Sequence, residues 1–232
     1  MSKVAIVTGG TSGIGQSIGT ALTSDGFTTI RVSRSPKMPD KYRRACDVRD
    51  KYSIRDLIFG VMEDFGRIDV LVNSAGIAST TPLERLGIHE WNDIISTNLT
   101  GSFLMCRDVI PHMVAAGFGR IINIGSIAGI KRSEVASVAY TCSKYGITGL
   151  TKQLAPIYAK DGITINCLCP SQTMTEMYSE NVSPEDGKKL SKANPMGRLA
   201  HPSDIAGVAR FLATDAAAYI NGETIAITGG IV

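Results

Sequence analysis

The amino-acid sequence predicts one α/β domain over residues 1–232, built on a doubly wound parallel sheet with helices on both faces. Strand-like and helix-like patterns alternate from end to end, and this alternation is typical of a parallel sheet covered by helices. A length of 232 residues suits a single domain. The sequence also contains no repeat, low-complexity stretch or linker that would divide the chain.

The expected strands are short apolar runs, and those after the first helix are bounded by glycine or polar residues. A buried parallel strand is expected to be apolar along most of its length, because helices cover both of its faces. The run at 68–76 leads directly into a turn of small residues. In chain order the expected strands cover residues 4–7, 28–33, 68–76, 119–126, 163–171 and 222–230.

The expected helices carry apolar residues at spacings of three and four. The first starts near Ile14 and is closed by Gly26, and Asp50 lies near the start of the second. Pro111 and Pro156 fall inside two later helices, where a proline bends the axis and costs about 3 kcal/mol. The expected helices cover residues 14–26, 50–66, 101–117, about 139–159 and 202–214, and the polar run 179–195 is expected to be a loop or short helix.

Charge and hydropathy exclude two classes of partner. The net charge is only +3 and the charges are dispersed, which argues against a nucleic-acid-binding protein. No apolar stretch approaches the roughly 20 residues of a membrane span. The opening run MSKVAIVTGG is interpreted as a first strand, because glycines interrupt it before a signal-peptide cleavage site.

The five cysteines form no CxxC pair. We therefore expect buried, reduced thiols in a cytoplasmic protein. Cys167 and Cys169 alternate within an apolar run, so a strand would place them on one face. No metal site is expected, because the three histidines lie far from the cysteines and from each other in the sequence.

A glycine motif, TGxxxGxG, follows the first strand and opens the first helix. Gly9, Gly13 and Gly15 allow a tight turn and close packing of helix on strand. They also let backbone N–H groups and the helix N-terminus approach a pyrophosphate. Thr11 and Ser12 can add hydroxyl donors. The motif predicts dinucleotide binding but does not identify a reaction.

The end of the second strand bears on the choice of cofactor. Folds that select NAD place an acidic residue there to bind the ribose 2′-hydroxyl. Here Ser33 occupies that position and Arg34 follows it. A guanidinium can pair with a 2′-phosphate, so we predict that NADP(H) is preferred. NAD(H) remains the alternative if Arg34 only stacks on the adenine.

The spacing TGxxxGxG resembles the glycine motif of the short-chain dehydrogenase/reductase family, and the resemblance extends almost to the C-terminus. NSAG at 73–76 is similar to the family's NNAG motif, with Ser74 replacing the second asparagine, and PSQTMT at 170–175 resembles PGxxxT, with Ser171 replacing glycine. The segments EWNDIISTNLTG and AAAYINGETIAITGG look most like the β-ketoacyl-acyl carrier protein (3-oxoacyl) reductase branch.

The resemblance implies a Rossmann-type fold and assigns the site residues one by one. It implies a catalytic set of Asn98, Ser126, Tyr140 and Lys144. It also implies contacts to the cofactor, including an adenine contact at Asp47 and Val48 after a third strand. With the residues noted above, the expected cofactor-binding set is Gly9, Thr11, Ser12, Gly13, Ile14, Ser33, Arg34, Asp47, Val48, Asn73, Ala75, Gly76, Tyr140, Lys144, Pro170, Thr173 and Thr175.

The catalytic set has a clear chemical use. The spacing YxxxK puts Tyr140 and Lys144 one helical turn apart on one face, and a nearby ammonium favours the phenolate form of a tyrosine. Tyr140 can then give a proton to a carbonyl oxygen, or take one back in the reverse direction. Ser126 can hold the same oxygen and Lys144 can reach the nicotinamide ribose, while the resemblance gives Asn98 a water chain that resupplies protons.

One loop departs from the family pattern. Tyr140 lies one residue farther from Ser126 than is usual, and the extra residue falls in GIKRSEVASV at 129–138. One hypothesis is that Lys131 and Arg132 meet an anionic substrate, such as a carboxylate, phosphate or carrier phosphopantetheine. The alternative is a solvated loop.

The sequence therefore predicts an NADPH-dependent enzyme that reduces a ketone or aldehyde to an alcohol, with 3-oxoacyl thioesters linked to a carrier or to CoA among the candidate substrates. One alternative is a dehydrogenase of a sugar, polyol or other small alcohol, and another is a dinucleotide-sensing protein without turnover. A substrate lid is expected at about 174–200. The resemblance further implies a homo-oligomer, either a tetramer or a dimer.

Overall fold

Seven parallel strands form one sheet in the order β3-β2-β1-β4-β5-β6-β7 in this computed structural model, which describes residues 2–231. Met1 and Val232, the end residues of the expected 1–232 domain, lie outside the described residues. The strands are β1 (Val4–Thr8), β2 (Thr28–Ser33), β3 (Arg43–Ala45), β4 (Val70–Asn73), β5 (Gly119–Ile124), β6 (Ile163–Pro170) and β7 (Thr224–Ile227). The parallel, doubly wound sheet of the sequence prediction is confirmed.

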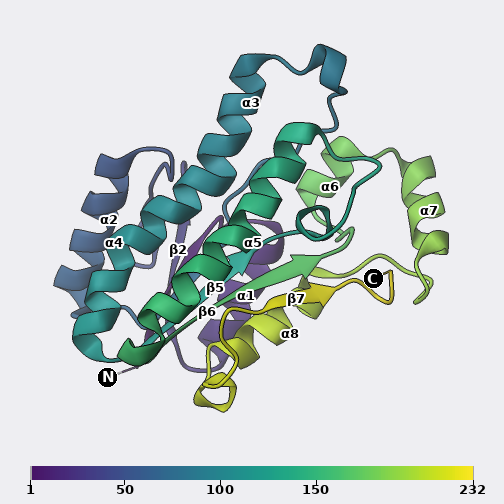
Figure 1. Cartoon of the computed structure of the whole chain (residues 1–232). Helices are drawn as coiled ribbons and strands as arrows, with labels where there is room; N and C mark the ends of the chain where they lie inside the picture. The colour runs from purple at the N-terminus through teal and green to yellow at the C-terminus, as the bar shows by residue number, and fades with distance from the viewer. Residues whose placement is uncertain (1, 232) are drawn as a thin grey trace.

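Helices cover both faces of the sheet (Figure 1). On one face, α2 (Lys51–Phe65), α4 (Gly101–Ala116) and α5 (Val138–Tyr158) pack on a core that includes Ile54, Val109 and Ile121. On the other, α1 (Gly13–Ser24) and α8 (Pro202–Leu212) pack on a second core that includes Leu22, Val72 and Ile205. No helix within residues 2–231 has the length and apolar character needed to cross a membrane.

The strand order places the functional segments together. β1 lies between β2 and β4. The chain adds β2 and β3 on one side of β1 and then crosses over to add β4 to β7 on the other side. In such sheets the crevice at this switch point, beyond the carboxyl ends of the strands, is where ligands bind. The glycine turn follows β1, the NSAG turn follows β4, Ser126 follows β5 and the PSQT segment follows β6.

Local signals explain where the main helices begin. Asp50 caps α2 by accepting hydrogen bonds from the backbone N–H groups of Tyr52 and Ser53. Ser137 caps α5 in the same way, by accepting from the backbone N–H of Tyr140 at 3.2 Å. The cap of α5 therefore also fixes the start of the turn that carries the YxxxK motif.

Three short helices were not predicted individually. The segment α3 (Ile88–Ile95) continues through a π-helical turn at Ser96–Thr100 into α4, and the polar run after β6 forms α6 (Glu176–Asn181) and α7 (Pro184–Ala193). Only Ile94 of α3 is buried, and no residue of α6 or α7 is. With eight, six and ten residues, these helices are shorter than the window of about 11–18 residues over which helical periodicity is recognised.

We predict that the central strand β4 is essential to stability. Leu71 is fully buried there, so Leu71→Ala is expected to lower the free energy of unfolding by about 2–5 kcal/mol. Leu83→Ala is the matched control, because Leu83 is 69% exposed and its truncation should change stability by no more than about 0.5 kcal/mol. Urea denaturation of both variants measures the two values, and equal losses would contradict the core described here.

Candidate functional site

The turn after β1 keeps its backbone open to a ligand. Gly9 and Gly13 have φ angles of +63° and +49°, which favour glycine. A Cβ at Gly9 would lie 2.9 Å from the carbonyl oxygen of Ser74, and one at Gly15 would collide with the carbonyl of Gly9. The glycines thus let the turn, the NSAG segment and the N-terminus of α1 approach one another, leaving backbone N–H groups at an anion-binding helix end.

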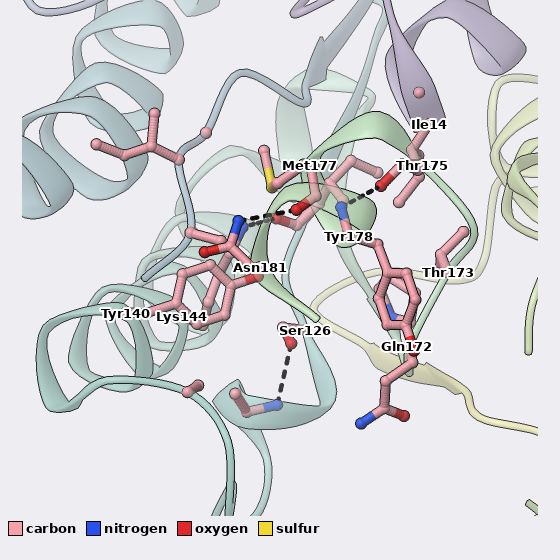
Figure 2. A pocket seen from close by; sticks show the side chains of 18 of the residues that line it. Ile14, Ser126, Tyr140, Lys144, Gln172, Thr173, Thr175, Met177, Tyr178 and Asn181 are labelled. Carbon is pink, nitrogen blue, oxygen red and sulfur yellow. Dashed lines mark hydrogen bonds between the residues drawn. The ribbon is translucent and has the colours of Figure 1, made fainter. Parts of the chain in front are cut away.

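This turn borders a cavity of about 260 Å³ that extends across the carboxyl ends of β4, β5 and β6. Figure 2 shows side chains of α1, α5, α6 and the segment after β6 around one pocket. Many residues that the sequence nominated line it together: Gly9, Ser12, Gly13, Ile14, Gly76, Ser126, Tyr140, Lys144, Pro170, Thr173 and Thr175.

The remaining nominated residues do not line this cavity. Some lie at or just after the carboxyl ends of β2 and β3. Others lie beneath the cavity or beside the glycine turn. These residues are Thr11, Ser33, Arg34, Asp47, Val48, Asn73, Ala75 and Asn98.

The group at the ends of β2 and β3 forms a polar patch beside the glycine turn. The hydroxyl oxygen of Ser33 is buried and has no hydrogen-bond partner among the described residues, and Arg34 is exposed. Arg49 donates to both oxygens of Asp47, at 3.0 and 2.7 Å. These bonds hold the pKa of Asp47 below its usual range, and the charge of Arg34 acts in the same direction.

Tyr140 and Lys144 lie one turn apart on α5 and both reach the cavity. Lys144 is only 6% exposed, and its Nζ donates to the backbone carbonyl of Ile124 at 2.8 Å. The same Nζ lies 5.5 Å from the centre of the Tyr140 ring. A buried ammonium needs polar partners, so this carbonyl fixes the cation beside the phenol.

Ser126 faces the same cavity from the end of β5. Its backbone is extended, with φ −167° and ψ 159°, and its Oγ accepts a hydrogen bond from the backbone N–H of Ala128 at 3.1 Å. This bond leaves the hydroxyl hydrogen free to be donated to a ligand. The Ser126 and Tyr140 hydroxyls thus approach the cavity from different elements (Figure 2).

Asn98 lies in the π-helical turn and is fully buried. Its Oδ1 accepts from the backbone N–H of Ile77 at 2.8 Å, and its Nδ2 donates to the carbonyl of Ile77 and to the hydroxyl of Ser143, both at 3.0 Å. A Cβ at Gly76 would lie 3.2 Å from Asn98 Oδ1 and 3.9 Å from Lys144 Nζ. Asn98 therefore ties the NSAG turn to α5 beside Lys144.

Asn73 differs from the expected cofactor contact in its placement. It is 3% exposed, and its Nδ2 donates to Asn123 Oδ1 at 2.9 Å and contacts the sulfur of Cys106 at 3.3 Å. Asn123 in turn donates to Thr151 on α5. The Asn73 side chain thus joins β4, β5 and α5 beneath the site and reaches no surface of the cavity.

The long loop after Ser126 turns its cations away from the cavity. Neither Lys131 nor Arg132 lines it, and Lys131 Nζ donates to the backbone carbonyl of Ile231 at 3.2 Å. Ser133, Val135 and Ala136 of the same loop do line the cavity. Lys131 therefore ties the loop to the C-terminal segment in this structure, and the anionic-substrate hypothesis gains no support from its position.

The segment after β6 contributes residues that the sequence analysis did not assign to the site. Gln172, Met177, Tyr178 and Asn181 all line the cavity (Figure 2). Asn181 donates from Nδ2 to the carbonyl of Met177 at 2.8 Å, while the Tyr178 hydroxyl is buried without a partner among the described residues. Burial raises the pKa of Tyr178. Gln172 is a variable position of the PSQTMT segment, and no motif marks Met177, Tyr178 or Asn181, which reach the cavity because α6 folds back over the sheet.

The residues present fit a pyridine dinucleotide. The glycine turn and the N-terminus of α1 suit a pyrophosphate, and the unpartnered Ser33 hydroxyl together with Arg34 offers polar contacts at the far end. Tyr140, Lys144 and Ser126 gather at the opposite end, over the carboxyl ends of β5 and β6. The protein thus presents a phosphate cradle and an acid–base group along one crevice.

A scan against family models matches residues 9–232 to a model described as enoyl-(acyl carrier protein) reductase. The chain is 38% identical to D-threitol dehydrogenase of Mycolicibacterium smegmatis, with 98% of this chain and 92% of that protein covered. It is also 38% identical to a 3-oxoacyl-(acyl-carrier-protein) reductase of Haemophilus influenzae, covering 99% and 98%. An acetoacetyl-CoA reductase of Rhizobium meliloti is 37% identical, covering 99% and 98%.

Solved structures show the same architecture. Ligand-free aldohexose dehydrogenase of Thermoplasma acidophilum superposes with a TM-score of 0.92 at 31% identity, covering 99% of this chain and 94% of that one. A variant of actinorhodin polyketide ketoreductase, solved with NADPH, superposes with a TM-score of 0.91 at 32% identity, covering 99% and 97%. Identity above 30% over nearly the whole length extends the likeness beyond the fold.

We predict that Gly13 is required for cofactor binding. In Gly13→Ala the new Cβ would lie 3.1 Å from a methyl group of Thr175 at the cavity wall, so the glycine turn or Thr175 must shift by a few tenths of an ångström. NADPH affinity should fall by about tenfold, which corresponds to 1.4 kcal/mol. Gly26→Ala is the matched control: Gly26 also has a positive φ, +86°, but has no atom within 4 Å of the added Cβ. Fluorescence titration with NADPH measures both, and equal affinities would refute the assignment of the cradle.

Proposed function

The chain belongs to the short-chain dehydrogenase/reductase family, and we propose that it is an NADPH-dependent reductase of a ketone or aldehyde, with Tyr140 as the proton donor. Oxidoreduction between an alcohol and a carbonyl is the common activity of the relatives named above, as their names state. The observation that carries the proposal is the gathering of Ser126, Tyr140 and Lys144 at one end of the cavity.

The bound cofactor supplies the hydride, and the residues of this chain handle the oxygen and its proton. The Ser126 hydroxyl donates a hydrogen bond to the substrate carbonyl oxygen and holds it near Tyr140. As charge develops on that oxygen, Tyr140 transfers its proton to it, and in the reverse direction the phenolate takes a proton from the alcohol. Positioning and charge stabilisation together lower the barrier.

Lys144 supports this step from a fixed place. Its anchor on the Ile124 carbonyl uses one of its three N–H groups. The other two are available to a ribose hydroxyl of the cofactor, and the cation lies 5.5 Å from the centre of the Tyr140 ring. Asn98 is a positioning residue in this proposal. It holds the turn at Gly76 beside Lys144, where a water chain could resupply protons.

The preference for NADPH rests on the ends of β2 and β3. No acidic side chain follows β2: Ser33 and Arg34 occupy that place. Arg49 forms an ion pair with Asp47, the acidic residue of this patch, and the charge of Arg34 also lowers the pKa of Asp47. A 2′-phosphate would then meet a guanidinium and a hydroxyl without an unpaired carboxylate, and charge-assisted hydrogen bonds of this kind are strong.

Two substrate classes remain in view, each favoured by a relative. A 3-oxoacyl thioester linked to a carrier or to CoA is favoured by the reductases of Haemophilus influenzae and Rhizobium meliloti, and a polyol by the D-threitol dehydrogenase. Acetoacetyl-CoA with NADPH and D-threitol with NADP⁺ or NAD⁺ separate the two. A dinucleotide sensor without turnover would not require the Ser126, Tyr140 and Lys144 set.

We also propose that the protein works as a homo-oligomer in the cytoplasm, a tetramer or a dimer. Phe103 and Val114 on α4 and Tyr145 and Ile157 on α5 are between 38% and 47% exposed, and neighbouring helices with exposed apolar side chains are typical of subunit interfaces. The five cysteines are all free, which suits a reducing compartment.

We predict that Tyr140→Phe abolishes turnover and leaves cofactor binding intact. Removing the acid–base hydroxyl should lower kcat by about 10²–10⁴-fold. NADPH affinity should change by no more than about threefold, which is less than the 1.4 kcal/mol that corresponds to a tenfold change. Tyr145→Phe is the control, since Tyr145 is 45% exposed and does not line the cavity. NADPH absorbance measures kcat with whichever of acetoacetyl-CoA and D-threitol the wild-type enzyme turns over, and a Tyr140→Phe enzyme with wild-type kcat would refute the mechanism.

The cofactor preference is tested at Arg34. Arg34→Ala should lower kcat/KM for NADPH by about tenfold, because a hydrogen bond to a charged group contributes about 1.5–3 kcal/mol, and should leave NADH unchanged. Arg55→Ala controls for the loss of one surface cation, because the Arg55 side chain is 72% exposed on α2. A tenfold wild-type preference for NADH would overturn the assignment.

A further inference from the structure

Two cysteines that the proposed mechanism does not use lie directly behind the catalytic serine. Cys167 and Cys169 are two residues apart on β6, so their side chains leave the same face of the strand. Their sulfur atoms are 3.7 Å apart, and both residues have no exposed surface. The expectation that a strand would place them on one face is met by this geometry.

The sulfur pair faces Gly125, the residue before Ser126. A Cβ at Gly125 would lie 2.7 Å from each of the two sulfurs, so the glycine leaves the space that both occupy. Ile147 completes this small buried cluster, with Leu99 and Ile130 packed against it. The backbone of the catalytic segment 124–126 therefore rests on two thiols, with Lys144 bonded to the Ile124 carbonyl beside them.

The distance between the two sulfurs indicates which kind of ligand the pair can bind. A disulfide needs an S–S distance of about 2.05 Å, so the two sulfurs are not bonded to each other at 3.7 Å. Two thiolates bound to one atom at about 2.3 Å lie about 3.3–3.8 Å apart when the bond angle at that atom is about 90–110°. The observed separation falls within that range. The pair is therefore spaced as a two-sulfur clamp for a single soft atom.

The residues around Cys167 and Cys169 limit the class of ligand that the two sulfurs can bind. Structural zinc takes four ligands, and within residues 2–231 no group of three or more His, Cys, Asp or Glu side chains could hold a metal ion. A monosubstituted trivalent arsenical needs only two sulfurs. We propose that Cys167 and Cys169 form a dithiol site for trivalent organoarsenicals and similar soft electrophiles that require two thiols, and that its occupation stops turnover.

The reaction balances without an oxidant. An arsenical R–As=O gains two As–S bonds, one to each cysteine, and loses its As=O bond. The two thiol protons leave with the oxide as water, so neither sulfur nor arsenic changes its oxidation state. The two sulfurs share one hydrogen bond in which either can be the donor. The positive charge of Lys144 lowers the pKa of both thiols, and burial raises it.

Occupation of the clamp has a structural consequence. The arsenic atom and its organic substituent need room that Gly125 and Ile147 now border. Moving Gly125 would shift Ser126 on one side and the Ile124 carbonyl that anchors Lys144 on the other. The loss of turnover rests on the proposed function, whereas binding of the arsenical does not.

Intact-mass spectrometry of the native, folded protein with stoichiometric phenylarsine oxide tests the binding. Wild-type protein should gain one phenylarsine and lose two titratable thiols, and excess 2,3-dimercaptopropanol should reverse both changes. Cys142→Ser should behave like wild type, since Cys142 is the exposed cysteine. Cys167→Val and Cys169→Ala should gain none. The proposal would be overturned if either variant gained as much phenylarsine as wild type, or if native wild type gained none. If a variant does not fold, peptide mapping of the wild-type adduct shows whether the arsenic is bound to Cys167 and Cys169.

Activity is the second measurement, made on the same samples. NADPH turnover of wild type and of Cys142→Ser should fall by about tenfold or more in proportion to the adduct, as expected for displaced catalytic groups, and Cys167→Val should be unaffected by the reagent. Fully labelled protein with unchanged turnover would overturn the coupling to the catalytic segment. If the protein binds phenylarsine but shows no NADPH turnover even before treatment, that result counts against the proposed function and not against the dithiol site.

Discussion

The hydrogen bond from Lys144 Nζ to the carbonyl of Ile124 is the interaction on which the site depends. It joins α5 to the end of β5 and places a cation in a position that is 6% exposed. An ammonium is costly to bury without partners, so this contact holds the Lys144 side chain at the end of β5. Tyr140 precedes Lys144 by one turn of α5, and Ser126 follows Ile124 by two residues, so both lie near the same contact.

The segment 124–126 therefore connects the features of the site. Its first residue anchors the cation and its last supplies a hydroxyl to the cavity. The glycine between them leaves room for the two sulfurs of β6. Asn98 and Gly76 close the opposite side of Lys144. A small displacement of this segment would move Ser126 and the anchor of Lys144 together, which is why we propose that the dithiol and the candidate site are coupled.

The sequence was informative where one residue type is physically required. Glycines at positive φ, such as Gly9 and Gly13, and the YxxxK spacing marked the turn and the acid–base pair. The sequence was uninformative where a position depends on distant packing. The Asn73 side chain bonds to Asn123 inside the sheet, Lys131 bonds to the C-terminal segment, and Asn181 reaches the cavity without any motif. Each of these outcomes depends on contacts between segments far apart in the chain.

A crystal structure of the complex with NADPH and a bound carbonyl compound tests the central claim most directly. The account predicts that the Tyr140 hydroxyl and the Ser126 hydroxyl both lie within hydrogen-bond distance of the carbonyl oxygen, about 2.5–3.0 Å. It also predicts that Lys144 keeps its bond to the Ile124 carbonyl while it contacts the nicotinamide ribose. A Tyr140 hydroxyl turned away from the reactive carbon of the nicotinamide ring, with Lys144 detached from Ile124, would contradict it.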